Sequence, residues 1–148
     1  MIPESKLIRS ELIIRELALT DDVMLARKSL VRWLALSLGL ISPNESRRLL
    51  IDTLDILLLF HGKNQPPTSK DVIAELHSSA GNEDPPSDKA VYYHLKRLVD
   101  GGVIFRKDGR YYFSEEGLRP AAVMKEAYLR KLDKTFENID KALDKLKY

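Results

Sequence analysis

A helical pattern that leads directly into a hairpin signal is the feature of this sequence that most limits its fold. In the first part of this region, apolar side chains recur at the spacing of one helix face: Val91, Leu95 and Leu98. Ser87 precedes the pattern as an N-cap, and Asp100-Gly101-Gly102 follows it as a stop. The sequence therefore predicts a helix from Asp88 to about Val99.

The residues after this helix have the pattern of two short strands. Val103 to Arg106 and Arg110 to Phe113 are rich in β-branched and aromatic side chains. Lys107-Asp108-Gly109 separates them, and Asp-Gly between two such runs is a strong signal for a hairpin turn. We expect an antiparallel hairpin over residues 103–113.

A longer apolar helix is expected before this region. Ser42 and Glu45 have the spacing of a capping box, and Pro43 occupies the first helical position, where its missing N–H costs nothing. The helix would continue through Phe60 and end at His61-Gly62. Its apolar residues cover most of the circumference, which predicts a position at the centre of the fold.

A shorter helix is expected between the central helix and the Ser87 cap. Thr68 is followed three residues later by Asp71, again with capping spacing. The inner face of this helix would consist of Val72, Ile73 and Leu76. Glycine and two prolines interrupt residues 80–86, which we therefore expect to form a loop.

Residues 1–41 are expected to form a helical extension. From Glu4 to Leu19, apolar side chains lie close to helical spacing, at Leu7, Ile8, Leu12, Ile13 and Leu17. Thr20-Asp21-Asp22 would cap a second helix from Val23 to Leu38, and Gly39 would end it. This extension either completes the core or provides a second dimer contact.

The last 35 residues, 114–148, are expected to form one helix that opens at Ser114-Glu115-Glu116, with Pro120 in its first turns. Apolar residues then recur in alternating steps of three and four: Leu129, Leu132, Phe136, Ile139, Leu143 and Leu146. This is the seam of a coiled coil of about two and a half heptads. We favour dimerisation through this seam over packing against the chain's own N-terminal helices.

The helix and hairpin also resemble a known motif. The runs AVYYHLKRLVDGGVI (residues 90–104) and RKDGRYYFSEEG (residues 106–117) are similar to the winged helix-turn-helix of ArsR-like repressors and their MarR and PadR relatives. In those families a YHLKxLxxxGhI helix leads into a wing that ends in an aromatic strand and a SEEG-like cap. The resemblance covers residues from about Arg47 to Gly117.

The resemblance implies a mainly α fold with a small β-hairpin wing. A winged helix-turn-helix (residues 42–113) would lie between the N-terminal extension (1–41) and a coiled-coil-like C-terminal helix (114–148). The implied function is that of a homodimeric transcriptional regulator that binds double-stranded DNA sequence-specifically, with helix 88–99 in the major groove and hairpin 103–113 as the wing. The cysteine-based sensing sites of many ArsR-like proteins have no counterpart, because the chain has no cysteine.

Positive charge is concentrated on these two elements. From Lys89 to Arg110 there are six cations and two acids, a net charge of +4, whereas the whole chain carries +2. The candidate DNA-binding residues are Ser87, Lys89, Tyr92, Tyr93, Lys96, Arg97, Arg106, Lys107 and Arg110. Residues 68–88 oppose this pattern, because they contain one lysine and five acids.

The residues of this helix also allow purely structural interpretations. Lys89, Lys96 and Arg97 would also suit an ordinary solvated helix face. One of Tyr92 and Tyr93 is expected to be half-buried. We interpret His94 as a structural residue packed against the hairpin.

Catalysis, cofactors and a membrane span are not expected. The chain lacks cysteine and has no nucleophile elbow, phosphate loop or histidine-carboxylate motif. His77 with Asp71 and Glu75 is the only hint of a metal site, and we expect no metal. The most apolar run, Leu30 to Ile41, is shorter than the roughly 20 residues that a spanning helix needs. With no targeting signal at the N-terminus, we expect a cytoplasmic protein. A single glutamine among many Lys and Glu residues is a bias that occurs in proteins from hot environments. We expect an archaeal source for a regulator of the resembled families.

A second functional class remains open. The modest net charge and the acidic segment 68–88 would also suit a winged-helix adaptor, or a subunit of a larger assembly, that binds a protein partner instead of DNA. Binding of structured RNA is a weaker third interpretation.

Overall fold

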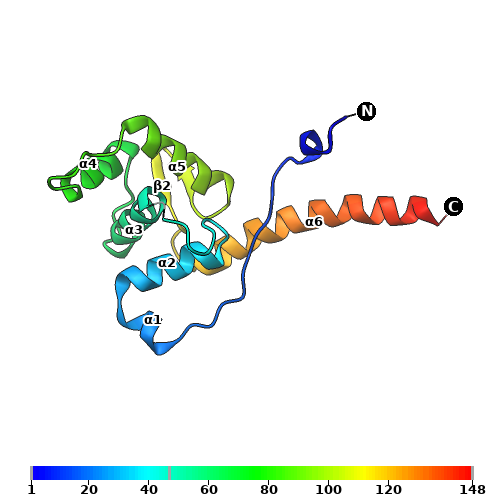
Figure 1. Ribbon diagram of the computed structural model, residues 1–148, viewed down its shortest axis with the longest axis horizontal. Helices are drawn as coiled ribbons and strands as arrows, with labels where there is room; N and C mark the ends of the chain where they lie inside the picture. The colour runs from blue at the N-terminus through cyan, green and yellow to red at the C-terminus, as the bar shows by residue number, and fades with distance from the viewer. Residues whose placement is uncertain (1, 47, 148) are drawn as a thin grey trace.

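The computed structural model of the chain describes residues 2–46 and 48–147. Arg47, where the resemblance begins, and the terminal residues Met1 and Tyr148 lie outside the described residues. Most of the described chain is helical, with one small antiparallel hairpin (Figure 1). The elements are η1 (Glu4–Leu7, a 3-10 helix), α1 (Asp21–Leu25), α2 (Arg27–Ser37), α3 (Arg48–Gly62), α4 (Ser69–Ser79), α5 (Asp88–Asp100), β1 (Phe105–Lys107), β2 (Arg110–Tyr112) and α6 (Pro120–Leu146).

The core forms around α3, as its apolar circumference predicts. Helices α2, α4 and α5 each pack against α3. The most deeply buried apolar side chains of α3 are Leu50, Leu54 and Leu57, and each contributes about 1.5–3 kcal/mol relative to an exposed position. The face of α5 predicted to be internal is fully buried, and Tyr111 and Phe113 extend the core under the hairpin.

The capping signals of α4 and α5 are confirmed. The Thr68 hydroxyl accepts a hydrogen bond from the Asp71 N–H (3.2 Å), and the Asp71 carboxylate accepts one from the Thr68 N–H (2.9 Å). The Ser87 hydroxyl accepts the Ala90 N–H at 3.2 Å. These bonds satisfy backbone donors that have no partner inside a helix, and they fix where both helices begin.

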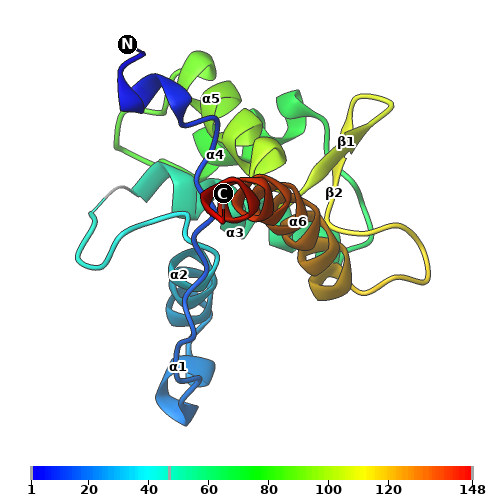
Figure 2. The same cartoon turned by 90° about the vertical axis from the view of Figure 1, so that its right-hand side faces the viewer.

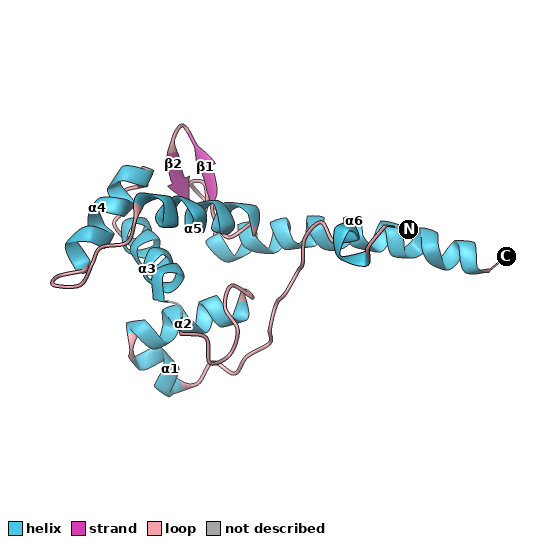
Figure 3. Ribbon diagram, turned by 45° about the horizontal axis from the view of Figure 1, so that its top comes forward, coloured by secondary structure: helices cyan, strands magenta, loops and turns pink. Residues whose placement is uncertain are grey.

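The predicted hairpin is also confirmed, with shorter strands. Phe105 pairs with Tyr112 and Lys107 with Arg110. Asp108 and Gly109 have φ values of +53° and +76°, which is the backbone of a type I′ turn. Figure 3 shows the hairpin rising beside α5. This layout of helices and hairpin is compatible with a winged-helix arrangement.

The predicted start of the central helix at Pro43 is wrong, because α3 begins at Arg48. The Glu45 carboxylate does accept the Ser42 N–H (2.8 Å), but the Glu45 N–H bonds to the backbone oxygen of Ser42 and not to its hydroxyl. Asn44 has a φ of +65°, a left-handed conformation that an α-helix excludes. The four residues therefore form a turn ahead of the helix.

The predicted helix from Glu4 to Leu19 is wrong as well. Only η1 is helical, and residues 13–18 run along α2 and the loop that follows it (Figure 1). Arg15 holds this segment, because its guanidinium donates to the backbone oxygens of Leu36 (2.7 Å) and Ile41 (2.8 Å). The Arg15 N–H donates to the Ser37 carbonyl at 2.9 Å. Bonds to carbonyls on another part of the chain thus replace the local bonds of a helix.

The predicted helix from Val23 to Leu38 is broken in two. Ala26 is extended, with φ of −121° and ψ of +130°, and separates α1 from α2. Arg27, the first residue of α2, pairs with Asp55 of α3 at 2.7 Å and docks α2 onto the core. Gly39, with φ of +71°, follows the end of α2 as predicted.

Helix α6 begins at Pro120 and not at Ser114, and the preceding residues form a loop in which Gly117 has φ of +84°. Only the first part of α6 touches the body: Tyr128 is buried, and its hydroxyl donates to the Leu38 carbonyl at 2.9 Å. The rest projects outward (Figures 1 and 2). The six seam residues are 38% to 81% exposed, so they do not pack on the chain's own N-terminal helices. Among the described residues, no helix combines the length and apolar character needed to cross a bilayer.

Candidate nucleic-acid interface

One side of α5 is exposed along its whole length. Lys89, Tyr92, Tyr93 and Lys96 all lie on this side, as the burial of the opposite face predicts. Tyr92 is 47% exposed, so about half of its surface is covered, as expected for one of the two tyrosines, and Tyr93 is 61% exposed. The core positions of this stretch are taken by Val91, His94 and Leu95, so both tyrosines lie outside the buried face of the helix.

The N-terminus of α5 is ordered by its cap. Because the Ser87 oxygen accepts the Ala90 N–H, its own hydroxyl proton stays available as a donor. Lys89 is exposed in the first helical turn. The free N–H groups and dipole of a helix N-terminus add to the attraction that Lys89 exerts on an anion.

Lys96 is held only weakly. It lies 3.6 Å from Asp100 in the next turn, with both side chains more than half exposed. Exposed pairs of this kind contribute about 0–1 kcal/mol, so the ammonium group is free to exchange Asp100 for another anion.

Arg97 is engaged with the body of the protein. Its guanidinium donates to the Leu40 carbonyl at 2.6 Å, and the side chain is half-buried. This bond ties α5 to the loop after α2. We therefore assign Arg97 a structural contact and leave it out of the candidate interface.

The hairpin adds three cations with different environments. Arg106 lies over the ring of its cross-strand partner Tyr111, 5.6 Å from the ring centroid. Lys107 is 3.8 Å from Glu115, and both are more than half exposed. Arg106 and Lys107 thus present their charge at the surface of the hairpin.

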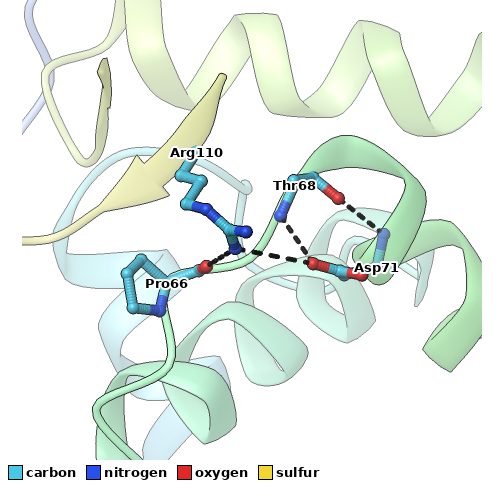
Figure 4. Close-up of polar contacts among 4 residues, drawn as sticks. All are labelled: Pro66, Thr68, Asp71 and Arg110. Atoms are coloured by element: carbon cyan, nitrogen blue, oxygen red, sulfur yellow. Dashed lines mark hydrogen bonds and ion pairs between the residues drawn. The ribbon is translucent and has the colours of Figure 1, made fainter. Parts of the chain in front are cut away.

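Arg110 serves as an anchor between the hairpin and α4 (Figure 4). Its guanidinium donates to the Pro66 carbonyl at 2.7 Å and lies 4.0 Å from the Asp71 carboxylate. The hydrogen bond from the Thr68 backbone and, to a smaller extent, the charge of Arg110 hold the pKa of Asp71 below its usual value of 3.8. The Tyr111 N–H also donates to the Pro67 carbonyl (2.9 Å), so β2 is attached to the segment before α4.

The histidines have structural surroundings. His94 is buried and its ring meets Tyr93 edge-on. His77 Nε2 is 3.0 Å from the Pro86 carbonyl and 3.9 Å from Asp88, so it connects α4 to the loop before α5. Over residues 2–46 and 48–147, no group of three His, Asp or Glu side chains could hold a metal ion.

The structural contacts of Arg97 and Arg110 could not be predicted from the sequence. Both partners are backbone carbonyls, at Leu40 and Pro66, and a carbonyl oxygen leaves no signal in a sequence. Comparisons with protein-family models, with curated proteins and with solved structures each found no match.

Proposed function

We propose that this protein is a homodimeric, sequence-specific DNA-binding protein with a winged helix-turn-helix, and that it regulates transcription. In this proposal α5 enters the major groove, the β1–β2 hairpin is the wing, and α6 joins two copies. One observation carries the proposal: the exposed side of α5 carries Lys89, Tyr92, Tyr93 and Lys96, and the hairpin that follows it in the chain exposes Arg106 and Lys107.

The chemistry of these side chains suits a DNA duplex. Lys89 and Lys96 would bind phosphate oxygens or the acceptor edge of guanine. The exposed phenols of Tyr92 and Tyr93 would donate to phosphates and contact thymine methyl groups with their rings. Arg106, at the surface of the hairpin, would bind the backbone next to the groove that α5 occupies.

The seam on α6 supports the dimer. Its six apolar residues remain exposed in the single chain, and such a row is energetically unfavourable in water. Pairing of two seams would bury it and present two α5 helices to one duplex, as two-fold operators require.

The test is fluorescence anisotropy with a labelled DNA duplex over a salt series. We expect log affinity to fall steeply and linearly with log salt, because bound phosphates release counterions. Lys89→Ala and Lys96→Ala should each reduce the magnitude of the slope by about 0.9 if each lysine binds one phosphate. Lys145→Ala, which removes an exposed cation from α6, is the matched control and should leave the slope unchanged.

Sequence specificity needs its own measurement. Selection from a random duplex library should enrich one motif, and Tyr92→Phe and Tyr93→Phe should change affinity for that motif more than for random DNA. Absence of binding even at low salt would refute the proposal.

A protein partner is the second candidate for the same face. The acids of α4 and of the loop before α5 favour it, because Asp71, Glu75, Glu83, Asp84 and Asp88 would repel a phosphate backbone. Arg110 compensates only Asp71. If DNA binding fails at every salt concentration, this adaptor role becomes the leading explanation of the exposed tyrosines.

A further inference from the structure

The first residues of the chain form an arm with unburied apolar side chains. We use the term N-terminal arm for residues 2–12, which comprise η1 and the extended chain after it. Ile2, Leu7 and Ile8 are each at least 60% exposed, and Leu12 is 37% exposed. Charged residues lie between these apolar ones, and most of the apolar surface of the segment remains exposed in the single chain.

The root of the arm is fixed to the body. Besides the Arg15 bonds, the Ser37 hydroxyl donates to the Arg15 carbonyl (2.8 Å), and the indole N–H of Trp33 donates to the Ala18 carbonyl (2.9 Å). Ile13 lies directly against Gly39. The direction in which the arm leaves the body is therefore set by the fold.

The arm leaves at the base of α6. Gly39 follows Leu38, whose carbonyl accepts the hydroxyl of Tyr128. Both ends of the chain extend to the same side of the body (Figures 1 and 3). Tyr128 begins the flank of the α6 seam that continues, at seven-residue spacing, with Thr135 and Ala142. This flank is uncharged, whereas the other carries Asp133, Asp140 and Lys147.

The seam alone provides a small interface. From the exposed fractions of its six residues, we obtain about 600 Å² of apolar surface per chain, or about 1,200 Å² for a pair, which is the lower limit for stable complexes. The four apolar residues of the arm add about 400 Å² per chain and bring the total to about 2,000 Å², the lower limit of the range for obligate dimers.

We propose that the N-terminal arm of one copy packs along the Thr135–Ala142 flank of α6 in a second copy. The inference rests on the proposed homodimer. The occupant of this flank is a second copy because, within one chain, the arm and the seam leave each other exposed although they start at neighbouring points. A second copy supplies an uncharged flank for each arm and buries both apolar sets together.

The first test measures the dimer dissociation constant of the full chain by sedimentation equilibrium. Ile8→Asp places a charge on the apolar side of the arm, and Ser10→Asp is the matched control at an exposed polar position of the same arm. We expect Ile8→Asp to raise the dissociation constant at least about tenfold, and Ser10→Asp to change it little. Equal constants for the two variants would overturn the inference.

The second test uses the absence of cysteine from the chain. A tagged Leu7→Cys chain is mixed with an untagged Ala142→Cys chain under mild oxidation, and the disulfide between different copies is quantified by mass spectrometry. A Lys141→Cys chain, with its thiol on the outer face of α6, is the control. We expect the mixed disulfide with Ala142→Cys in clear excess over the control.

Together the two tests distinguish a failure of the arm contact from a failure of the proposed DNA-binding dimer. Mixed disulfide no more abundant than the control, in a protein that sediments as a dimer and binds DNA, overturns the arm contact and leaves the DNA-binding proposal intact. A protein that is monomeric at all concentrations overturns both the arm contact and the α6 dimer.

Discussion

Gly39→Ala tests how the N-terminal segment is held on the body. Gly39 has φ of +71°, and a Cβ at this position would overlap the carbonyl oxygen of Ile13 and lie 2.7 Å from its Cβ. No rotamer change can relieve contact with a carbonyl oxygen. The segment must move away instead, and its bonds through Arg15 oppose that movement.

The expected loss of stability in Gly39→Ala follows from a comparison with Gly81→Ala. Gly81 also has a positive φ, +58°, but a Cβ there would meet nothing within 4 Å. Alanine at either position destabilises the folded state by about 1–2 kcal/mol, because its backbone is left-handed. It also reduces the entropy of the unfolded chain, which offsets about 0.4–1 kcal/mol of that cost. Overpacking at Gly39 adds about 1–3 kcal/mol. We expect Gly39→Ala to be less stable than Gly81→Ala by this last amount.

Urea unfolding of the two variants measures the difference in the free energy of unfolding. Hydrogen exchange locates it, because the Arg15 amide bonds to the Ser37 carbonyl and should lose protection in Gly39→Ala alone. Equal stability of the two variants, or an Arg15 amide that stays protected in Gly39→Ala, would refute the argument that Gly39 is required for this contact.

Three further predictions follow from single contacts. Ser87→Ala should destabilise the protein by about 1 kcal/mol in urea unfolding, because the Ala90 N–H loses its acceptor, whereas Ser87→Asn should retain most of the stability. Asp71 has a pKa below 3.8 in the folded protein, so its contribution to stability is present above that pH and is lost as the pH falls through the folded pKa. Asp71→Asn should therefore show a flatter loss of stability in acid, and an unchanged acid profile would contradict this. Tyr128→Phe should lower the free energy of unfolding by about 0.5–1.5 kcal/mol, because it removes the hydrogen bond to the Leu38 carbonyl. Burial raises the pKa of Tyr128 above 10, so the parent protein should lose stability at high pH, and the Phe variant should lose less.

Local signals in the sequence were sufficient for the part of the fold from α4 to β2. The caps at Thr68 and Ser87 and the turn at Asp108-Gly109 each depend on residues within three positions of one another. The buried face of α5 follows from its period alone. These features could be predicted because the interactions that fix them are encoded within a few neighbouring residues.

The N-terminal region could not be predicted in the same way. Residues 4–19 have helical spacing of apolar side chains, but Arg15 binds carbonyls that are 21 and 26 residues away, and these bonds favour an extended chain. The break at Ala26 accompanies the pairing of Arg27 with Asp55, 28 residues away. Exposure of the α5 side chains could be inferred from sequence, whereas the anchoring of Arg97 could not, because its partner is a backbone atom of a distant loop.

The length of α6 has a consequence for the geometry of any operator. The helix has 27 residues, which corresponds to about 40 Å. If the two helices of a dimer run antiparallel, α6 becomes a spacer that separates the two bodies by more than the roughly 35 Å of one DNA turn. If they run parallel, the bodies meet at one end and the spacer has no effect on their separation. The distance between recognition sequences on the duplex would thus report the orientation of the helices.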